Sequence, residues 1–102
     1  MKIVTITNPI NTNQKIGMVA RYEKTRNGFK HEAETTDGVT AKACYLNRTY
    51  EAYTYKTVLH QLAYNWIVRH TGWNPKTKRD GAKFNEMWTK MNTEIDNTKN
   101  WL

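Results

Sequence analysis

The most distinctive chemistry in this chain is a concentration of positive charge in its second half. Segment 69–83 contains five basic residues and one acidic residue, Asp80. The basic residues are Arg69, Lys76, Lys78, Arg79 and Lys83. The formal net charge of the whole 102-residue chain is +7, so this segment carries much of the excess. A positive field held on a folded scaffold attracts polyanions, above all the phosphates of nucleic acid.

The stretch 74–81 is the best candidate for a binding site within this segment. Its Lys and Arg side chains can neutralise phosphates and release counterions, while Thr77 and backbone N–H groups can donate hydrogen bonds to phosphate oxygens. The stretch leads into a predicted helix, whose first N–H groups favour anions. Trp73, just before it, can stack on a base or pack against the core, and we favour packing. The predicted binding residues are Arg69, Trp73, Lys76, Thr77, Lys78, Arg79 and Lys83. The alternative is an ordinary solvated loop between two helices.

The remaining reactive side chains show no catalytic or metal-binding pattern. His31 and Cys44 fall close together in the predicted sheet, but two ligands are too few for a zinc site. His60 lies on the polar side of a predicted helix and has no acid at i±3 or i±4 to orient it as a general base. No nucleophile-elbow, P-loop, HExxH or paired-carboxylate spacing occurs. We therefore expect a binding protein rather than an enzyme, with no metal and no cofactor.

Size and composition favour a small cytoplasmic protein. A chain of 102 residues fits one domain, 1–102, and its four Trp, six Tyr and two Phe residues can fill one modest core. The single cysteine excludes an internal disulfide, which suits a reducing cytoplasm. No apolar run has the length of a signal peptide or of a membrane span, so we expect no membrane partner.

The elements that must position the basic segment change character near residue 48. Before it, β-branched and polar residues alternate between turn signals, which predicts an antiparallel β-meander of about four strands over 1–46, beginning with strands at 2–7 and 15–26. Asn27-Gly28 predicts a two-residue type I′ turn that pairs Tyr22 with Ala33. The core face of the next strand then contains Phe29, His31 and Ala33.

The second reversal, at Asp37-Gly38, can be read in two registers. A two-residue loop places Thr40, Lys42 and Cys44 on the core face. A three-residue loop, with Gly38 in the left-handed conformation of a G1 bulge, places Val39, Ala41, Ala43 and Tyr45 there instead. A slip of one residue moves every side chain to the other face, and the three-residue loop buries the apolar set, so we predict that loop.

Two amphipathic helices are predicted after the meander. Helix one covers 54–71, with Thr54 as N-cap and Gly72 as C-terminal cap. Its apolar stripe is Tyr55, Val58, Leu59, Leu62, Ala63, Trp66 and Ile67. Helix two covers 80–99 with Asp80 as its cap. Its apolar face is Phe84, Met87, Trp88, Met91 and Ile95. Two helices against one face of the sheet give a two-layer α+β fold.

Cations also occur in the predicted sheet, but acids lie among them. The face turned away from the helices carries both signs of charge: Arg21, Lys30, Glu23, Glu32 and Glu34. The acids dilute the positive field, so we expect this face to be solubilising. Lys24 and Arg26, nearer the hairpin tip, could extend a basic surface. The aromatic run Tyr50, Tyr53 and Tyr55, with Arg48, could stack on unpaired bases, but at a helix entry we favour core packing.

Residues 45–55, YLNRTYEAYTY, resemble a segment of small, mostly uncharacterised bacteriophage proteins. In that group a strand meander precedes an LNRT-aromatic-E-x-aromatic-T segment, and a helix beginning near TVL follows it, here Thr57-Val58-Leu59. Arg21–Phe29 adds similarity, and the resemblance covers roughly residues 1–65. It implies an origin in a phage or mobile element and a place in the cytoplasm of the infected bacterium. Such proteins often act on nucleic acid or inhibit host defence systems.

Two functions follow as hypotheses. The first is a nucleic-acid-binding accessory protein that holds the phosphates of DNA or RNA through the basic segment. The alternative is a phage-encoded inhibitor of a host defence nuclease, of the anti-CRISPR type. It would contact an acidic protein surface or bound RNA within a host nucleoprotein, and exposed aromatic residues would supply its affinity.

Overall fold

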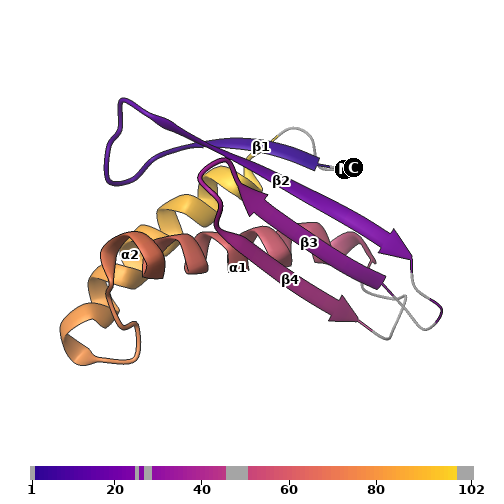
Figure 1. The fold of residues 1–102 in the computed structure, drawn as a ribbon. Helices are drawn as coiled ribbons and strands as arrows, with labels where there is room; N and C mark the ends of the chain where they lie inside the picture. The colour runs from indigo at the N-terminus through magenta and orange to yellow at the C-terminus, as the bar shows by residue number, and fades with distance from the viewer. Residues whose placement is uncertain (1, 25, 27–28, 46–50, 99–102) are drawn as a thin grey trace.

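The computed structural model of the chain describes residues 2–24, 26, 29–45 and 51–98. Four antiparallel strands form one sheet in the order β1-β2-β3-β4, and two helices follow (Figure 1). The strands are β1 (Lys2–Thr7), β2 (Lys15–Lys24), β3 (Phe29–Thr35) and β4 (Thr40–Tyr45). The helices are α1 (Glu51–Thr71) and α2 (Lys78–Asp96). The predicted α+β fold, a meander followed by two helices, is confirmed.

Both helices cover the same face of the sheet, as Figure 1 shows. Helix α1 packs across β2, β3 and β4, and α2 packs against β1 and α1. Buried residues alternate with more exposed ones along the strands, the period of two that a sheet with one covered face requires. The buried strand residues include Val4, Ile6, Ile16, Met18, Ala20 and Ala33.

The predicted three-residue turn between β3 and β4 is confirmed. The N–H of Thr35 donates to the carbonyl of Val39 at 2.9 Å, and the N–H of Gly38 donates to the carbonyl of Thr35 at 3.1 Å. Gly38 has φ of +92°, a conformation that a residue without Cβ adopts at little cost. Val39 and Ala41 are buried as expected.

The predicted pairing across the first hairpin is wrong by two residues. Tyr22 pairs with His31 rather than Ala33, and β2 ends at Lys24 rather than at residue 26. The predicted register would place Glu23 opposite Glu32, whereas the observed one places Glu23 opposite Lys30 and so avoids like charges across the strands. An even shift keeps each side chain on its face, so His31 remains buried. The Asn27-Gly28 turn itself lies outside the described residues.

Helix α1 begins at Glu51, so the predicted N-cap at Thr54 is wrong. Thr54 lies within the helix. Ala52 is a strong helix former, and an acid such as Glu51 is favourable in a first turn, so nothing in 51–54 opposes the helix. The C-terminal cap is as predicted, because Gly72 has φ of +71° and its N–H donates to the carbonyl of Val68 at 2.9 Å. The predicted stripe is confirmed: Val58, Leu59, Leu62, Ala63, Trp66 and Ile67 are buried and Tyr55 packs beside them.

Helix α2 begins at Lys78 and its N-cap is Thr77, not Asp80. Thr77 has an extended backbone, and its Oγ1 accepts the N–H of Asp80 at 3.3 Å. A hydroxyl at the N-cap satisfies a helix N–H directly, which leaves Asp80 in the first turn, where an acid also stabilises the helix. The helix ends at Asp96, short of the predicted 99. Phe84, Met91 and Ile95 are buried on the predicted face, with Met87 and Trp88 packed against them.

Candidate functional site

Asn74 and Asp80 fix the loop between α1 and α2. The Asn74 side-chain Oδ1 accepts the N–H of Lys76 at 3.0 Å. Its carbonyl oxygen accepts the N–H of Thr77 at 3.2 Å and the Thr77 hydroxyl at 2.9 Å. The N–H of Asn74 donates to Oδ2 of Asp80 at 3.1 Å. These bonds connect the loop to the first turn of α2, so the neighbouring cations extend from an ordered backbone.

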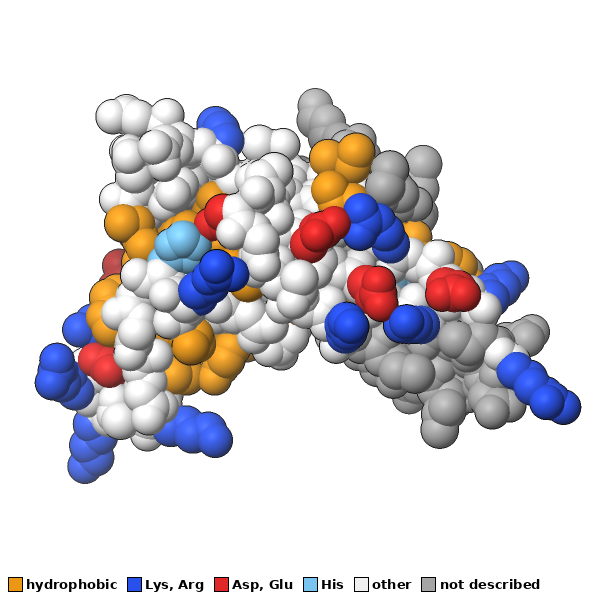
Figure 2. All heavy atoms as spheres, in the orientation of Figure 1, with side chains coloured by type: hydrophobic (Ala, Val, Ile, Leu, Met, Phe, Trp, Pro, Cys, Tyr) orange, Lys and Arg blue, Asp and Glu red, His pale blue; other side chains and the backbone are white. Residues whose placement is uncertain are grey.

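Four of the predicted cations lie around the start of α2. Lys76 precedes the N-cap, Lys78 and Arg79 are the first residues of the helix, and Lys83 lies about one turn further along. All four are exposed. Among the described residues, neither Lys76 nor Lys78 forms an ion pair. Figure 2 shows Lys and Arg side chains gathered at the lower left, the end of the molecule where this loop projects.

Asp80 offsets this positive charge only in part. Its Oδ1 lies 3.4 Å from Nζ of Lys83 and 3.7 Å from Nε of Arg79. The hydrogen bond from the N–H of Asn74 lowers the pKa of Asp80 most; burial opposes this, and the two cations lower the pKa further, so Asp80 is a carboxylate near neutral pH. The Arg79 side chain is 89% exposed, and such surface pairs are weak. The loop therefore keeps an excess of accessible cations.

The start of α2 also presents backbone donors. The N–H of Asp80 is satisfied by Thr77 Oγ1, and the N–H of Gly81 by the carbonyl of Thr77 at 2.9 Å. Within the described part of the chain, the N–H groups of Lys78 and Arg79 have no acceptor. Together with the positive end of the helix dipole, they suit an anion. The Thr77 hydroxyl already donates to the Asn74 carbonyl and accepts the N–H of Asp80. In this structure Thr77 therefore holds the loop and the helix start in place and does not itself offer a hydrogen bond to a ligand.

Of the other two predicted residues, Trp73 lies beside Lys83, whereas Arg69 extends toward the β3–β4 turn and does not join the four cations. Arg69 is exposed in the last turn of α1, and its Nη1 is 4.0 Å from where a Cβ on Gly38 would lie, so it sits beside the β3–β4 turn. Trp73 is partly buried and packs against the core, as favoured from the sequence. Nζ of Lys83 lies 4.7 Å from the centroid of the Trp73 ring, within cation–π range.

The open face of the sheet carries mixed charge, as expected. Arg21 Nη1 lies 2.9 Å from Glu34 Oε1, and Lys30 Nζ lies 3.1 Å from Glu32 Oε1. The hydrogen bond from Lys30 is the main cause of a lowered pKa at Glu32. Red and blue side chains lie side by side over this face in Figure 2. Opposite charges this close cancel beyond a Debye length, so this face has no strong field of its own.

Two histidine–aspartate contacts join parts of the chain that are far apart in sequence. His60 Nε2 lies 2.8 Å from Asp96 Oδ1, and His70 Nε2 lies 2.7 Å from Asp37 Oδ2. The sequence showed no acid at i±3 or i±4 of His60; the acid that contacts it, Asp96, comes instead from the end of α2. Each pair fastens α1 to a neighbouring element.

Asp37 joins a turn to the core. The Thr35 hydroxyl donates to its Oδ1, and Nε1 of Trp66 donates to its Oδ2 at 3.0 Å, which satisfies the polar atom of a side chain only 1% exposed. Partial burial raises the pKa of Asp37, but the hydrogen bonds from Thr35, Trp66 and His70 outweigh it and the pKa is lowered overall. The sequence indicated only a turn at this position.

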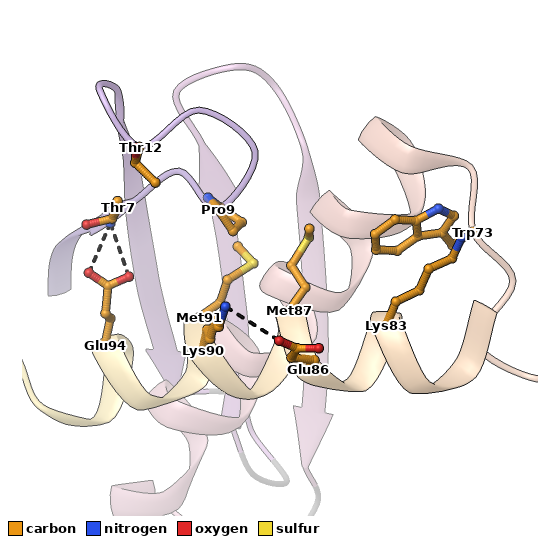
Figure 3. A pocket seen from close by; sticks show the side chains of 10 residues that line it. All are labelled: Thr7, Pro9, Thr12, Trp73, Lys83, Glu86, Met87, Lys90, Met91 and Glu94. Carbon is orange, nitrogen blue, oxygen red and sulfur yellow. Dashed lines mark hydrogen bonds and ion pairs between the residues drawn. The ribbon is translucent and has the colours of Figure 1, made fainter. Parts of the chain in front are cut away.

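A groove of about 340 Å³ lies beside the basic loop, between α2 and the β1–β2 loop (Figure 3). Pro9 and Thr12 line one side, Met87 and Met91 the other, and Trp73 closes one end. No sequence signal joined these residues, because the two sides come from opposite ends of the chain. The charged residues Lys83, Glu86, Lys90 and Glu94 of α2 also line it.

The described residues show no metal site and no membrane-spanning helix. Among them, no three His, Cys, Asp or Glu residues gather where they could hold a metal ion. No described helix is both long and apolar enough to cross a bilayer. His31 is buried between the rings of Tyr22 and Tyr55, at 5.0 and 5.1 Å between centroids, so Tyr55 packs in the core. Arg48, Tyr50 and the side chain of Tyr53 lie outside what is described.

Comparison with known proteins adds no relative to these observations. No protein-family model, no curated protein and no solved structure matches this chain.

Proposed function

We propose that this protein is a non-enzymatic binder of nucleic acid and that the start of α2, with the loop before it, is its contact surface. The observation that carries the proposal is the group of exposed cations formed by Lys76 on the hydrogen-bonded loop and by Lys78 and Arg79 at the start of α2. The only acid within the loop and the first turn of the helix, Asp80, has a side chain that is only 15% exposed. A long side chain on an ordered backbone loses less freedom on binding than one on a flexible tail.

The contacts that such a surface offers are mainly to phosphate. Lysine and arginine side chains and helix N–H groups bind phosphate oxygens and carry little information about base sequence. We therefore expect weak sequence selectivity and strong salt dependence. This agrees with the accessory role in a phage or mobile element, inside the bacterial cytoplasm, that the segment 45–55 suggested.

A charge-matched pair of variants tests the proposal. The first combines Lys78→Glu with Arg79→Glu, at the start of α2. The second combines Lys24→Glu with Arg26→Glu, near the β2–β3 connection at the other end of the molecule in Figure 1. Each variant changes four units of charge, so each lowers the formal net charge from +7 to +3. Affinity for a labelled oligonucleotide is measured by fluorescence anisotropy at about 50 mM salt.

The proposal predicts that the α2 variant loses at least about tenfold in affinity while the hairpin variant stays close to the parent protein, with both folded by circular dichroism. Equal losses in both would mean that only net charge matters. No retention of DNA or RNA at this salt concentration would contradict the proposal. A pull-down from bacterial lysate that survives nuclease treatment would then favour the alternative, an inhibitor of a host defence nuclease.

A further inference from the structure

The groove beside the basic loop has the size and lining of a ligand site. Its volume of about 340 Å³ lies at the lower end of the roughly 300–1,000 Å³ typical of ligand pockets. Met87 and Met91 supply flexible, polarizable side chains, Pro9 faces them from the β1–β2 loop, and the Trp73 ring ends the groove (Figure 3). Thioether and indole groups make favourable contacts with flat aromatic rings.

The charges that line the groove balance, because Glu86 and Glu94 stand beside Lys83 and Lys90, so the groove has no net positive charge to attract phosphate. The Glu94 carboxylate is held in place by the N–H of Thr7, at 3.2 and 3.3 Å from its two oxygens. Glu86 lies on the same side and pairs loosely with Lys90 at 3.7 Å. Carboxylates repel phosphate but accept hydrogen bonds from the amino and imino groups of bases. A neutral, planar group with N–H donors therefore fits this groove better than an anion.

Lys83 connects the groove to the phosphate-binding surface. Its Nζ is 3.4 Å from Asp80, within the first turns of α2, and 4.7 Å from the centroid of the Trp73 ring. The ammonium group thus lies over a ring face on which a base can stack. If the Lys83 ammonium group moves to bind a phosphate, the face of the Trp73 ring becomes accessible to a base. Lys83 would then link the binding of the phosphate to the binding of the base.

We propose that the groove accepts an unpaired nucleobase while the loop holds the adjacent phosphates, so that the site prefers single-stranded to double-stranded nucleic acid. This inference rests on the proposed function. In a duplex the faces of the bases are stacked on their neighbours, so only a base outside the duplex can lie against Trp73. Stacking of this kind tolerates any base, in keeping with the low sequence selectivity expected above.

Three labelled probes of equal length test the inference by fluorescence anisotropy at one salt concentration: oligothymidylate, a duplex, and a strand of abasic sites that keeps the phosphates without the bases. Thr12→Leu narrows the groove from an exposed loop position without a change of charge. Asn13→Leu, exposed in the same loop but outside the groove, is its matched control. Trp73→Phe keeps an aromatic ring and removes the fluorescence of that indole.

We expect oligothymidylate to bind about fivefold to about a hundredfold more tightly than the abasic strand, the range given by one stacked base. Thr12→Leu should remove most of that difference and Asn13→Leu should keep it. Oligothymidylate should quench tryptophan emission in the parent protein but much less in Trp73→Phe. Equal affinity for all three probes, unaffected by Thr12→Leu, would overturn the inference and leave the phosphate surface intact. Failure to bind any probe would instead contradict the proposed function.

Discussion

At the scale of single residues, Asp37 shows how one carboxylate can hold a turn, a helix and the core together. Its oxygens accept from the hydroxyl of Thr35, the indole of Trp66 and the ring of His70. Only the first of these lies near Asp37 in sequence. The signal Asp37-Gly38 was therefore sufficient to predict the turn but could not show that its acid also serves a buried tryptophan.

We predict that Asp37→Ala destabilises the protein by about 1–3 kcal/mol at neutral pH, because it leaves the buried Trp66 Nε1 without its acceptor. Since the folded-state pKa of Asp37 is lowered, the part of its contribution that depends on its negative charge is present above the unfolded pKa of about 3.9 and is lost as the pH falls through the folded value. Urea unfolding at pH 7 and in acid below the folded-state pKa should show a smaller difference between the two proteins in acid.

The control for this prediction is Glu34→Ala, which removes a carboxylate whose pair with Arg21 lies on the surface. Exposed pairs contribute at most about 1 kcal/mol, so this variant should unfold close to the parent protein. If the two substitutions lowered the free energy of unfolding equally, the hydrogen bond from Trp66 to Asp37 would contribute no more to stability than an exposed ion pair.

Thr77 is a second residue whose role can be separated from that of its neighbours. Aspartate is as good an N-cap as threonine but cannot donate to the Asn74 carbonyl, so Thr77→Asp should lower the free energy of unfolding by at most about 1.5 kcal/mol. It also places a negative charge where we expect phosphate, so oligonucleotide affinity should fall. Chemical denaturation and anisotropy on the same samples measure the two effects, and unchanged affinity would move the binding surface away from the start of α2.

At the scale of helices and strands, the sequence pattern correctly predicted the features that depend on residues close together in the chain. The stripe from Val58 to Ile67 gave the buried face of α1, and the apolar residues after Gly38 gave the register of β4. The predictions were wrong where a contact between residues distant in sequence decides the structure, or where two residues could each act as the N-cap of a helix. Thr77 and Asp80 were both acceptable caps in the sequence, and only the placement of Asn74 shows how each is used. The register of β2 with β3 depended on charges across the strands that a turn signal does not contain.

The role of Gly72 in ending α1 can be tested by substitution. Its φ of +71° is costly for a residue with a Cβ, yet no atom lies within 4 Å of where that Cβ would be. Gly72→Ala should therefore destabilise the protein by about 1–2 kcal/mol through backbone conformation alone. Gly72→Asn should cost less, because asparagine tolerates this conformation better. Equal thermal stability of the two variants would contradict this account of the end of α1.

At the scale of the whole molecule, charge is distributed unevenly along a body of 42 × 29 × 22 Å. The sheet carries opposite charges in close pairs, while the end with the start of α2 carries exposed cations around a single partly buried acid. The sequence located this excess, since it depends on residues near each other in the chain. It could not locate the groove, whose sides are Thr12 and Met87, because their proximity is a product of the fold.

The most direct test of the central claim is the salt dependence of binding to duplex DNA. Each phosphate contact contributes about −0.9 to the slope of log K against log salt concentration, so three to four loop cations predict a slope of about −3. Lys78→Glu with Arg79→Glu should reduce its magnitude by about 2, and Lys24→Glu with Arg26→Glu should leave it almost unchanged. A slope near zero, or the same slope in all three proteins, would contradict the claim that the start of α2 binds nucleic-acid phosphate.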